Sequence, residues 1–133
     1  MSEFYKPGSE AEQIVCAISG TFLLVTISDG RFEKSEEIRL RRGLIDTAKF
    51  TGLSATEMDT IALSAQAAFE ADYDKASAHT LKQVAALKAH ALARRAITDT
   101  ARRAVVTDKT VTPQEENALN VLAHALGLKE GEL

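Results

Sequence analysis

The chain has 133 residues, of which 45% are hydrophobic and 26% charged, and this balance predicts one small globular domain rather than a disordered chain. Its formal net charge of -3 gives no electrostatic basis for binding nucleic acid or an anionic membrane. The least charged stretch, residues 13–28, is too short and too polar to cross a bilayer, and acidic residues precede it where a secretory signal would be basic. We therefore expect a soluble, cytoplasmic protein with no direct membrane insertion, in which Cys16 is a small buried side chain.

Three segments follow one another along the chain: a lead-in at residues 1–8, one helical domain at 9–128 and a tail at 129–133. The first helix is expected to start at Ser9, which has the spacing of a capping box with Glu12, and to end before Asp29. Because this helix is apolar around most of its circumference, it should lie in the centre of a bundle. Gly20 within it is expected to admit a closely packed helix.

Local sequence signals predict where the second, third and last helices begin. A second helix should run from Lys34 to Gly52, and a third should begin with a capping box at residues 54–57. For the last helix, Thr112 is the predicted N-cap, with Pro113 at the first position and Glu115 closing the capping box.

Between these signals, residues 53–112 contain neither glycine nor proline, and 16 of the 50 residues from Ala55 to Ala104 are alanine. Strands and hairpins need turn residues more often, so this stretch predicts an all-α fold. As one helix it would be on the order of 90 Å long, far beyond the size of such a domain. We expect breaks at residues 72–74 and 88–91, giving a compact bundle of six to seven short helices.

A repeated acidic pattern, D-x-x-hydrophobic-x-x-x-E-E, precedes the second and the last helix, at residues 29–37 and 108–116. The copies lie 79 residues apart, and each following helix ends at Gly-Leu. This predicts a duplicated helix-loop-helix packed about a pseudo-twofold axis. The pattern matches the second half of an EF-hand loop, but apolar residues such as Val25 and Ile27 occupy the earlier ligand positions. Neither loop could hold calcium alone, whereas the two copies could pool four carboxylates.

These residues resemble the tellurite-resistance TerB family and the wider TerB-like superfamily. Residues 27–32 with Glu36, residues 106–111 with Glu115, and Leu126-Gly127-Leu128 carry the resemblance, which covers residues 12–128. It implies an internally duplicated helical bundle with an acidic, divalent-cation-binding surface, found in stress-response or envelope-associated assemblies, with no established catalytic activity. Carried over to this chain, the metal site comprises four residues: Asp29, Glu36, Asp108 and Glu115.

Oxygen ligands favour Ca²⁺, Mg²⁺ or Mn²⁺ over Zn²⁺, and we expect weak binding. Lys109 stands where the family has glycine, and its ammonium would neutralise part of the site. This substitution suits an alternative, a metal-independent interaction domain that docks a basic protein partner through the same acidic face. In a third, purely structural interpretation, Glu36 and Glu115 cap helices while Asp29 and Asp108 form turns. Self-association stays open.

Other polar groups point to no further chemistry. Asp99 is four residues from both Arg95 and Arg103, which favours a charge-paired helix face over a nucleic-acid site. His79 and His90 would be about 16 Å apart on one unbroken helix, too far to share a metal. The sequence shows no Ser/His/Asp or Cys/His arrangement and no glycine-rich phosphate loop, so we expect a protein that is not an enzyme.

Overall fold

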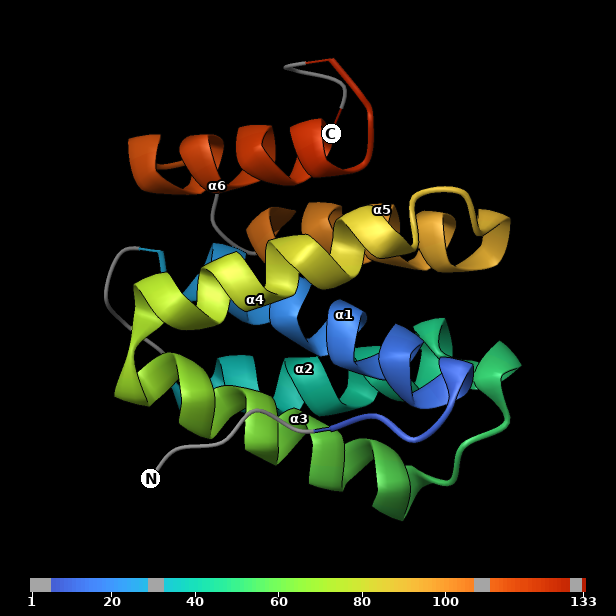
Figure 1. Cartoon of the computed structure of the whole chain (residues 1–133). Coiled ribbons are helices and arrows are strands. Elements are labelled where there is room, and N and C mark those ends of the chain that lie inside the picture. The colour runs from blue at the N-terminus through green and yellow to red at the C-terminus, as the bar shows by residue number, and fades with distance from the viewer. Residues whose placement is uncertain (1–5, 29–32, 107–110, 130–132) are drawn as a thin grey trace.

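The computed structural model describes residues 6–28, 33–106, 111–129 and 133, and over these residues the fold is all-helical (Figure 1). Six α-helices and one 3₁₀ turn make up the described part, which confirms the predicted fold class. Their bounds are α1 Glu10–Thr26, α2 Lys34–Thr47, η1 Lys49–Thr51, α3 Ala55–Ala71, α4 Tyr73–Ala86, α5 Ala91–Val106 and α6 Pro113–Ala125. In the described part, no helix is long and apolar enough to span a membrane.

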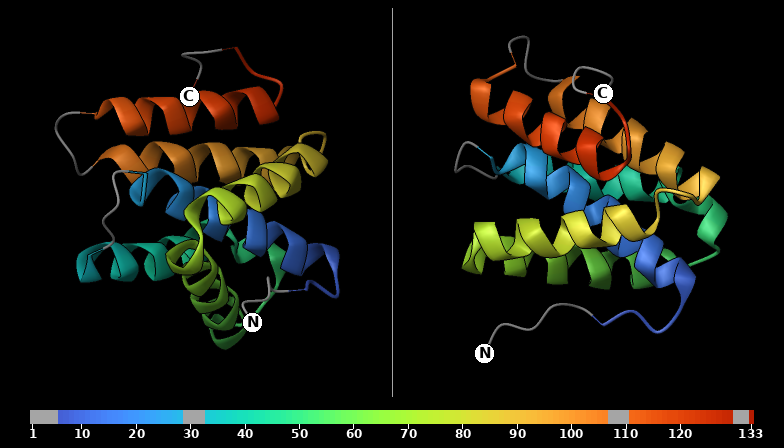
Figure 2. Two further views of the ribbon diagram at one scale, coloured as in Figure 1. Left: turned by 60° about the vertical axis from the view of Figure 1, so that its left-hand side comes forward. Right: turned by 45° about the horizontal axis from the view of Figure 1, so that its top comes forward.

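Helix α1 forms the centre of the bundle, as its apolar circumference predicted. Every residue from Ile14 to Thr26 is buried, and the helix contacts all five other α-helices (Figures 1 and 2). Ser9 caps its start by accepting a hydrogen bond from the Glu12 N–H at 3.2 Å. The Glu12 carboxylate accepts from the Gly8 N–H at 2.6 Å, so the expected capping box is closed one residue earlier than predicted.

Gly20 is the point where α4 crosses α1. A Cβ built on Gly20 would overlap the Thr80 hydroxyl and lie 2.7 Å from Thr80 Cγ2, closer than real contacts allow. The predicted role of Gly20 in close helix packing is therefore confirmed. The same crossing buries Cys16, and this burial raises the pKa of its thiol to about 12, so the thiol stays protonated at neutral pH.

Both predicted breaks in the alanine-rich stretch are present. Asp72 ends α3 and caps α4, where its carboxylate accepts from the Lys75 N–H at 3.1 Å. Helix α4 ends at Ala86, and His90 Nδ1 accepts from the Ala93 N–H at 3.2 Å in the first turn of α5. A side chain that caps a helix start marks each of the two breaks.

Helix α2 ends earlier than the sequence predicted. It stops at Thr47, and residues 49–51 form a 3₁₀ turn before Gly52, which has a φ of 79°. The physical reason is local: the Thr51 hydroxyl donates to the Ala48 carbonyl at 2.6 Å, and Gly52 adopts the left-handed conformation that reverses the chain.

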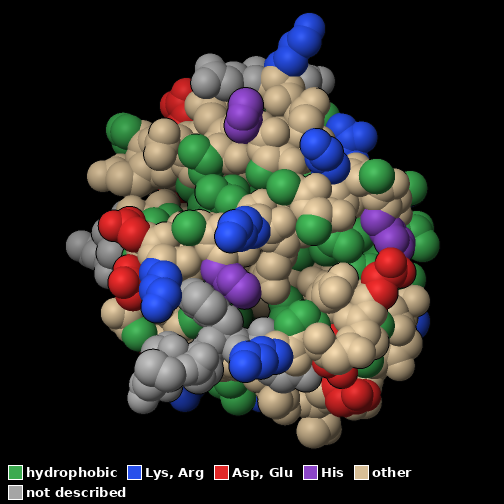
Figure 3. All heavy atoms as spheres, viewed as in Figure 1, with side chains coloured by type: hydrophobic (Ala, Val, Ile, Leu, Met, Phe, Trp, Pro, Cys, Tyr) green, Lys and Arg blue, Asp and Glu red, His purple; other side chains and the backbone are tan. Residues whose placement is uncertain are grey.

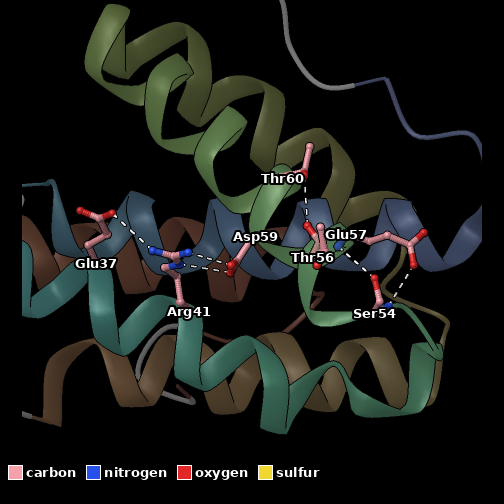
Figure 4. Close-up of polar contacts among 7 residues, drawn as sticks. All are labelled: Glu37, Arg41, Ser54, Thr56, Glu57, Asp59 and Thr60. Atoms are coloured by element: carbon pink, nitrogen blue, oxygen red, sulfur yellow. Dashed lines mark hydrogen bonds and ion pairs between the residues drawn. The ribbon is translucent and has the colours of Figure 1, made fainter.

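An arginine holds α2 against α3 (Figure 4). Arg41 donates to both carboxylate oxygens of Asp59, with Nε–Oδ1 at 3.1 Å and Nη2–Oδ2 at 2.7 Å. Arg41 also lies 4.0 Å from Glu37 Oε1, one turn earlier in α2, in a longer ion pair. The Arg41 hydrogen bonds lower the pKa of Asp59, because they favour its charged form. Arg41 thus bridges two helices rather than serving only one helix face.

Candidate functional site

The acidic residues singled out by the repeat divide into two groups. Asp29 and Asp108 lie outside the described residues. Glu36 and Glu115 are described, and each is the third residue of its helix, α2 or α6. The helix ends that flank the two acidic loops, namely the ends of α1 and α5 and the starts of α2 and α6, lie on the same side of the bundle (Figure 2).

Glu115 closes the capping box that the sequence predicted. Its Oε1 accepts from the Thr112 N–H at 3.0 Å, and the Thr112 hydroxyl accepts from the Glu115 N–H at 3.1 Å. The residue is only 3% exposed, and it forms no ion pair with any residue of the described part. A carboxylate at this depth depends on the backbone N–H and on the positive end of the α6 dipole for its stability.

Glu36 has the equivalent position in α2 but a more open environment. Its Oε1 accepts from the Glu33 N–H at 2.9 Å, and the side chain is half-buried. Because glutamate is a less common N-cap residue than threonine, the sequence alone supports a capping role for Glu36 less strongly than for Glu115. The structure corrects this point, since both glutamates cap their helices.

Metal-ligand clusters are absent from the described ranges, in which no three His, Cys, Asp or Glu side chains lie close enough to hold one ion. The histidines form separate purple patches in Figure 3. His90 Nε2 lies 3.4 Å from Glu10 Oε1, and burial lowers the pKa of His79. Any cation bound on the acidic side would therefore need Asp29 or Asp108.

The expected pairing of charges along α5 is not formed. Within the described part, no ion pair joins Asp99 to Arg95 or Arg103. A different contact joins this helix end to a neighbour: the backbone carbonyl of Arg103 accepts a hydrogen bond from Arg39 Nη2 of α2 at 2.7 Å. Over the face in Figure 3, basic side chains are scattered among polar and apolar ones rather than gathered.

Sequence reasoning missed a cleft between α2 and α5, on the side of α1, with a volume of about 280 Å³; we call it the α2–α5 cleft. Its buried wall consists of Ile18, Phe22, Leu40 and Leu44. Its more exposed wall carries Arg39, Arg42, Asp46 and Arg103. The one sequence feature that points to this cleft is Gly43, a glycine in the middle of a helix with arginines nearby. The spacing of apolar residues alone does not show that Gly43 lies beside a cleft.

In comparisons with known proteins, the chain matches no family model, no curated protein and no solved structure. Function is therefore inferred from the residues of this chain.

Proposed function

We propose that this protein is a non-enzymatic, TerB-like binding module whose acidic side binds a divalent cation. The acidic side comprises Asp29, Glu36, Asp108 and Glu115. The observation that carries the proposal is the matched placement of two glutamates, each third in its helix, at two helix starts on one side of the bundle.

The environment of Glu115 adds support. Its Oε1 is used by the cap, while Oε2 accepts no hydrogen bond from a described residue. Among the described residues no cationic side chain pairs with this nearly buried carboxylate, and a bound cation would stabilise it. Because each cap already holds one glutamate oxygen, few oxygens are left for the ion, which predicts weak binding of Ca²⁺, Mg²⁺ or Mn²⁺.

Calorimetric titration of the whole chain with each ion tests the proposal. We expect weak, saturable binding that Asp29→Asn/Asp108→Asn abolishes. The matched control is Glu37→Gln/Glu116→Gln, which removes the neighbouring acid from each copy and leaves the proposed ligands in place. Absence of heat with all three ions, or equal binding by the two double variants, would refute cation binding.

A second candidate is metal-independent docking of a basic protein partner on the same acidic side. The capping bonds of Glu36 and Glu115 favour it, because they hold the carboxylates in place without an ion. A lysine-rich peptide serves as the probe, with binding followed by fluorescence anisotropy in the presence of chelator. This candidate predicts binding that weakens with salt and is lost in Asp29→Asn/Asp108→Asn; peptide binding that requires the ion would contradict it.

A further inference from the structure

A second, chemically different site lies in the α2–α5 cleft. We propose that this cleft binds an amphiphilic carboxylate of the medium-chain fatty acid class, with its chain on the apolar wall and its carboxylate between Arg42 and Arg103. The inference is independent of the acidic side, because it uses none of the four acidic residues.

Charge complementarity selects an anion. Three arginines line the cleft against one acid, Asp46, in a chain whose net charge is negative. None of these four residues forms an ion pair within the described part of the chain. Guanidinium groups bind carboxylates in a two-pronged geometry, and Arg42 and Arg103 reach the cleft from two different helices.

Arg39 is held in place before any ligand arrives. Its Nη2 donates to the Arg103 carbonyl at 2.7 Å, and its guanidinium carbon lies 5.5 Å from the centre of the Phe22 ring. These contacts fix one charged edge of the cleft against its apolar wall. An arginine that is already ordered costs a ligand less side-chain entropy on binding.

Gly43 leaves the cleft open, although the packing of the fold does not require a glycine at this position. A Cβ built there would meet only Arg103 Nη1, at 3.9 Å, which is an ordinary contact distance. Glycine inside a helix costs about 0.5–1 kcal/mol relative to alanine, so packing gives no reason for its presence. The space that a side chain at position 43 would occupy belongs to the cleft.

Thr100 adds an unsatisfied polar group to the cleft lining. The residue is 5% exposed, and its hydroxyl has no hydrogen-bond partner among the described residues. Thr98, two residues earlier in the same helix, donates to the Arg94 carbonyl at 2.8 Å in the usual helical manner. The Thr100 hydroxyl, although buried, could therefore turn toward a bound carboxylate without the loss of a bond to the described part of the chain.

The cleft volume sets the size of the ligand. At about 280 Å³ it lies just below the range of roughly 300–1,000 Å³ typical of small-molecule sites. A short apolar chain fits this space, whereas a full-length membrane lipid does not.

Titration of the whole chain with octanoate, followed by amide chemical shifts and calorimetry, tests the proposal. Acetate lacks the chain and 1-octanol lacks the charge, so both should bind at least about tenfold more weakly than octanoate. Arg103→Gln should weaken octanoate binding about tenfold and leave octanol binding unchanged. Gly43→Leu should abolish both, because a leucine side chain fills the cleft.

Equal binding of octanoate and octanol, or octanoate binding that survives Gly43→Leu, would overturn the proposal. Absence of octanoate binding would overturn it too. If dimerisation is instead observed, and Gly43→Leu removes it, a second copy of the chain fills the cleft and the fatty-acid assignment is wrong. Should Gly43→Leu fail to fold, Arg103→Gln decides the question, since its side chain is exposed and its replacement leaves the core intact.

Discussion

Two glycines in the middle of helices, Gly20 in α1 and Gly43 in α2, have opposite structural consequences. At Gly20 the neighbouring helix α4 comes so close that no side chain fits. At Gly43 the facing helix α5 stays far enough away to leave the α2–α5 cleft. Close packing requires a glycine at the first position, whereas packing does not require one at the second, which we attribute to the proposed ligand.

The largest effect should come from Gly20→Ala. Its methyl group would overlap Thr80, and overpacking of this kind costs about 2–3 kcal/mol in free energy of unfolding. Urea unfolding measures the loss. Adding Thr80→Ala to the same chain should restore part of it, because this second substitution removes the hydroxyl and methyl groups that the new side chain would meet. Unchanged stability of Gly20→Ala would show that the α1–α4 crossing is looser than described.

Gly43→Ala should have a smaller effect of the opposite sign. Since the nearest atom to the new methyl group is 3.9 Å away, the gain in helix propensity dominates, and the free energy of unfolding should rise by about 0.5–1 kcal/mol. The same urea experiment applies. Destabilisation by Gly43→Ala would remove the contrast between the two glycines.

The smallest expected change in the free energy of unfolding comes from loss of the Arg41–Asp59 contact, which holds α2 against α3. Hydrogen bonds from Arg41 lower the pKa of Asp59 below its ordinary value of 3.8, so the folded state favours the charged carboxylate. The stabilisation is then fully present above about pH 4 and is lost as the pH falls through the lowered pKa. Both side chains are more than a third exposed, so solvent screens most of the interaction.

The matching measurement compares the wild type with Asp59→Asn in urea as the pH is lowered from 7 to about 3. Their difference in unfolding free energy should be smaller than either glycine effect and should shrink below pH 4. A difference that grows with acid would mean that Asp59 is protonated more easily in the fold than in the unfolded chain.

Much of the fold was predictable from the sequence because its signals are local. Capping residues such as Thr112 and Asp72 and the continuous apolar surface of α1 each act within one or two turns. The end of α2 was placed too late because a 3₁₀ turn and an α-helix share almost the same apolar spacing over residues 48–51. The pseudo-twofold relation between the halves stays a prediction.

The sites were less predictable, for a physical reason. The repeat identified Glu36 and Glu115 as candidate site residues. The burial of Glu115, however, depends on how the helices pack, which the repeat does not show. The α2–α5 cleft joins Arg42 to Arg103, and no local pattern relates residues so far apart in sequence. Gly20 and Gly43 look alike in the sequence, and only the distance to the facing helix separates them.

The central claim is that two copies of an acidic motif share one cation. The most direct test adds Mn²⁺ to the isotope-labelled protein and records the NMR relaxation of its backbone amides. Paramagnetic broadening falls off steeply with distance from the ion. We predict that the amide signals of Glu36 and Glu115 broaden together at the same Mn²⁺ concentration and recover with chelator. Broadening of only one of the two, or of neither while other residues broaden, would contradict a shared site.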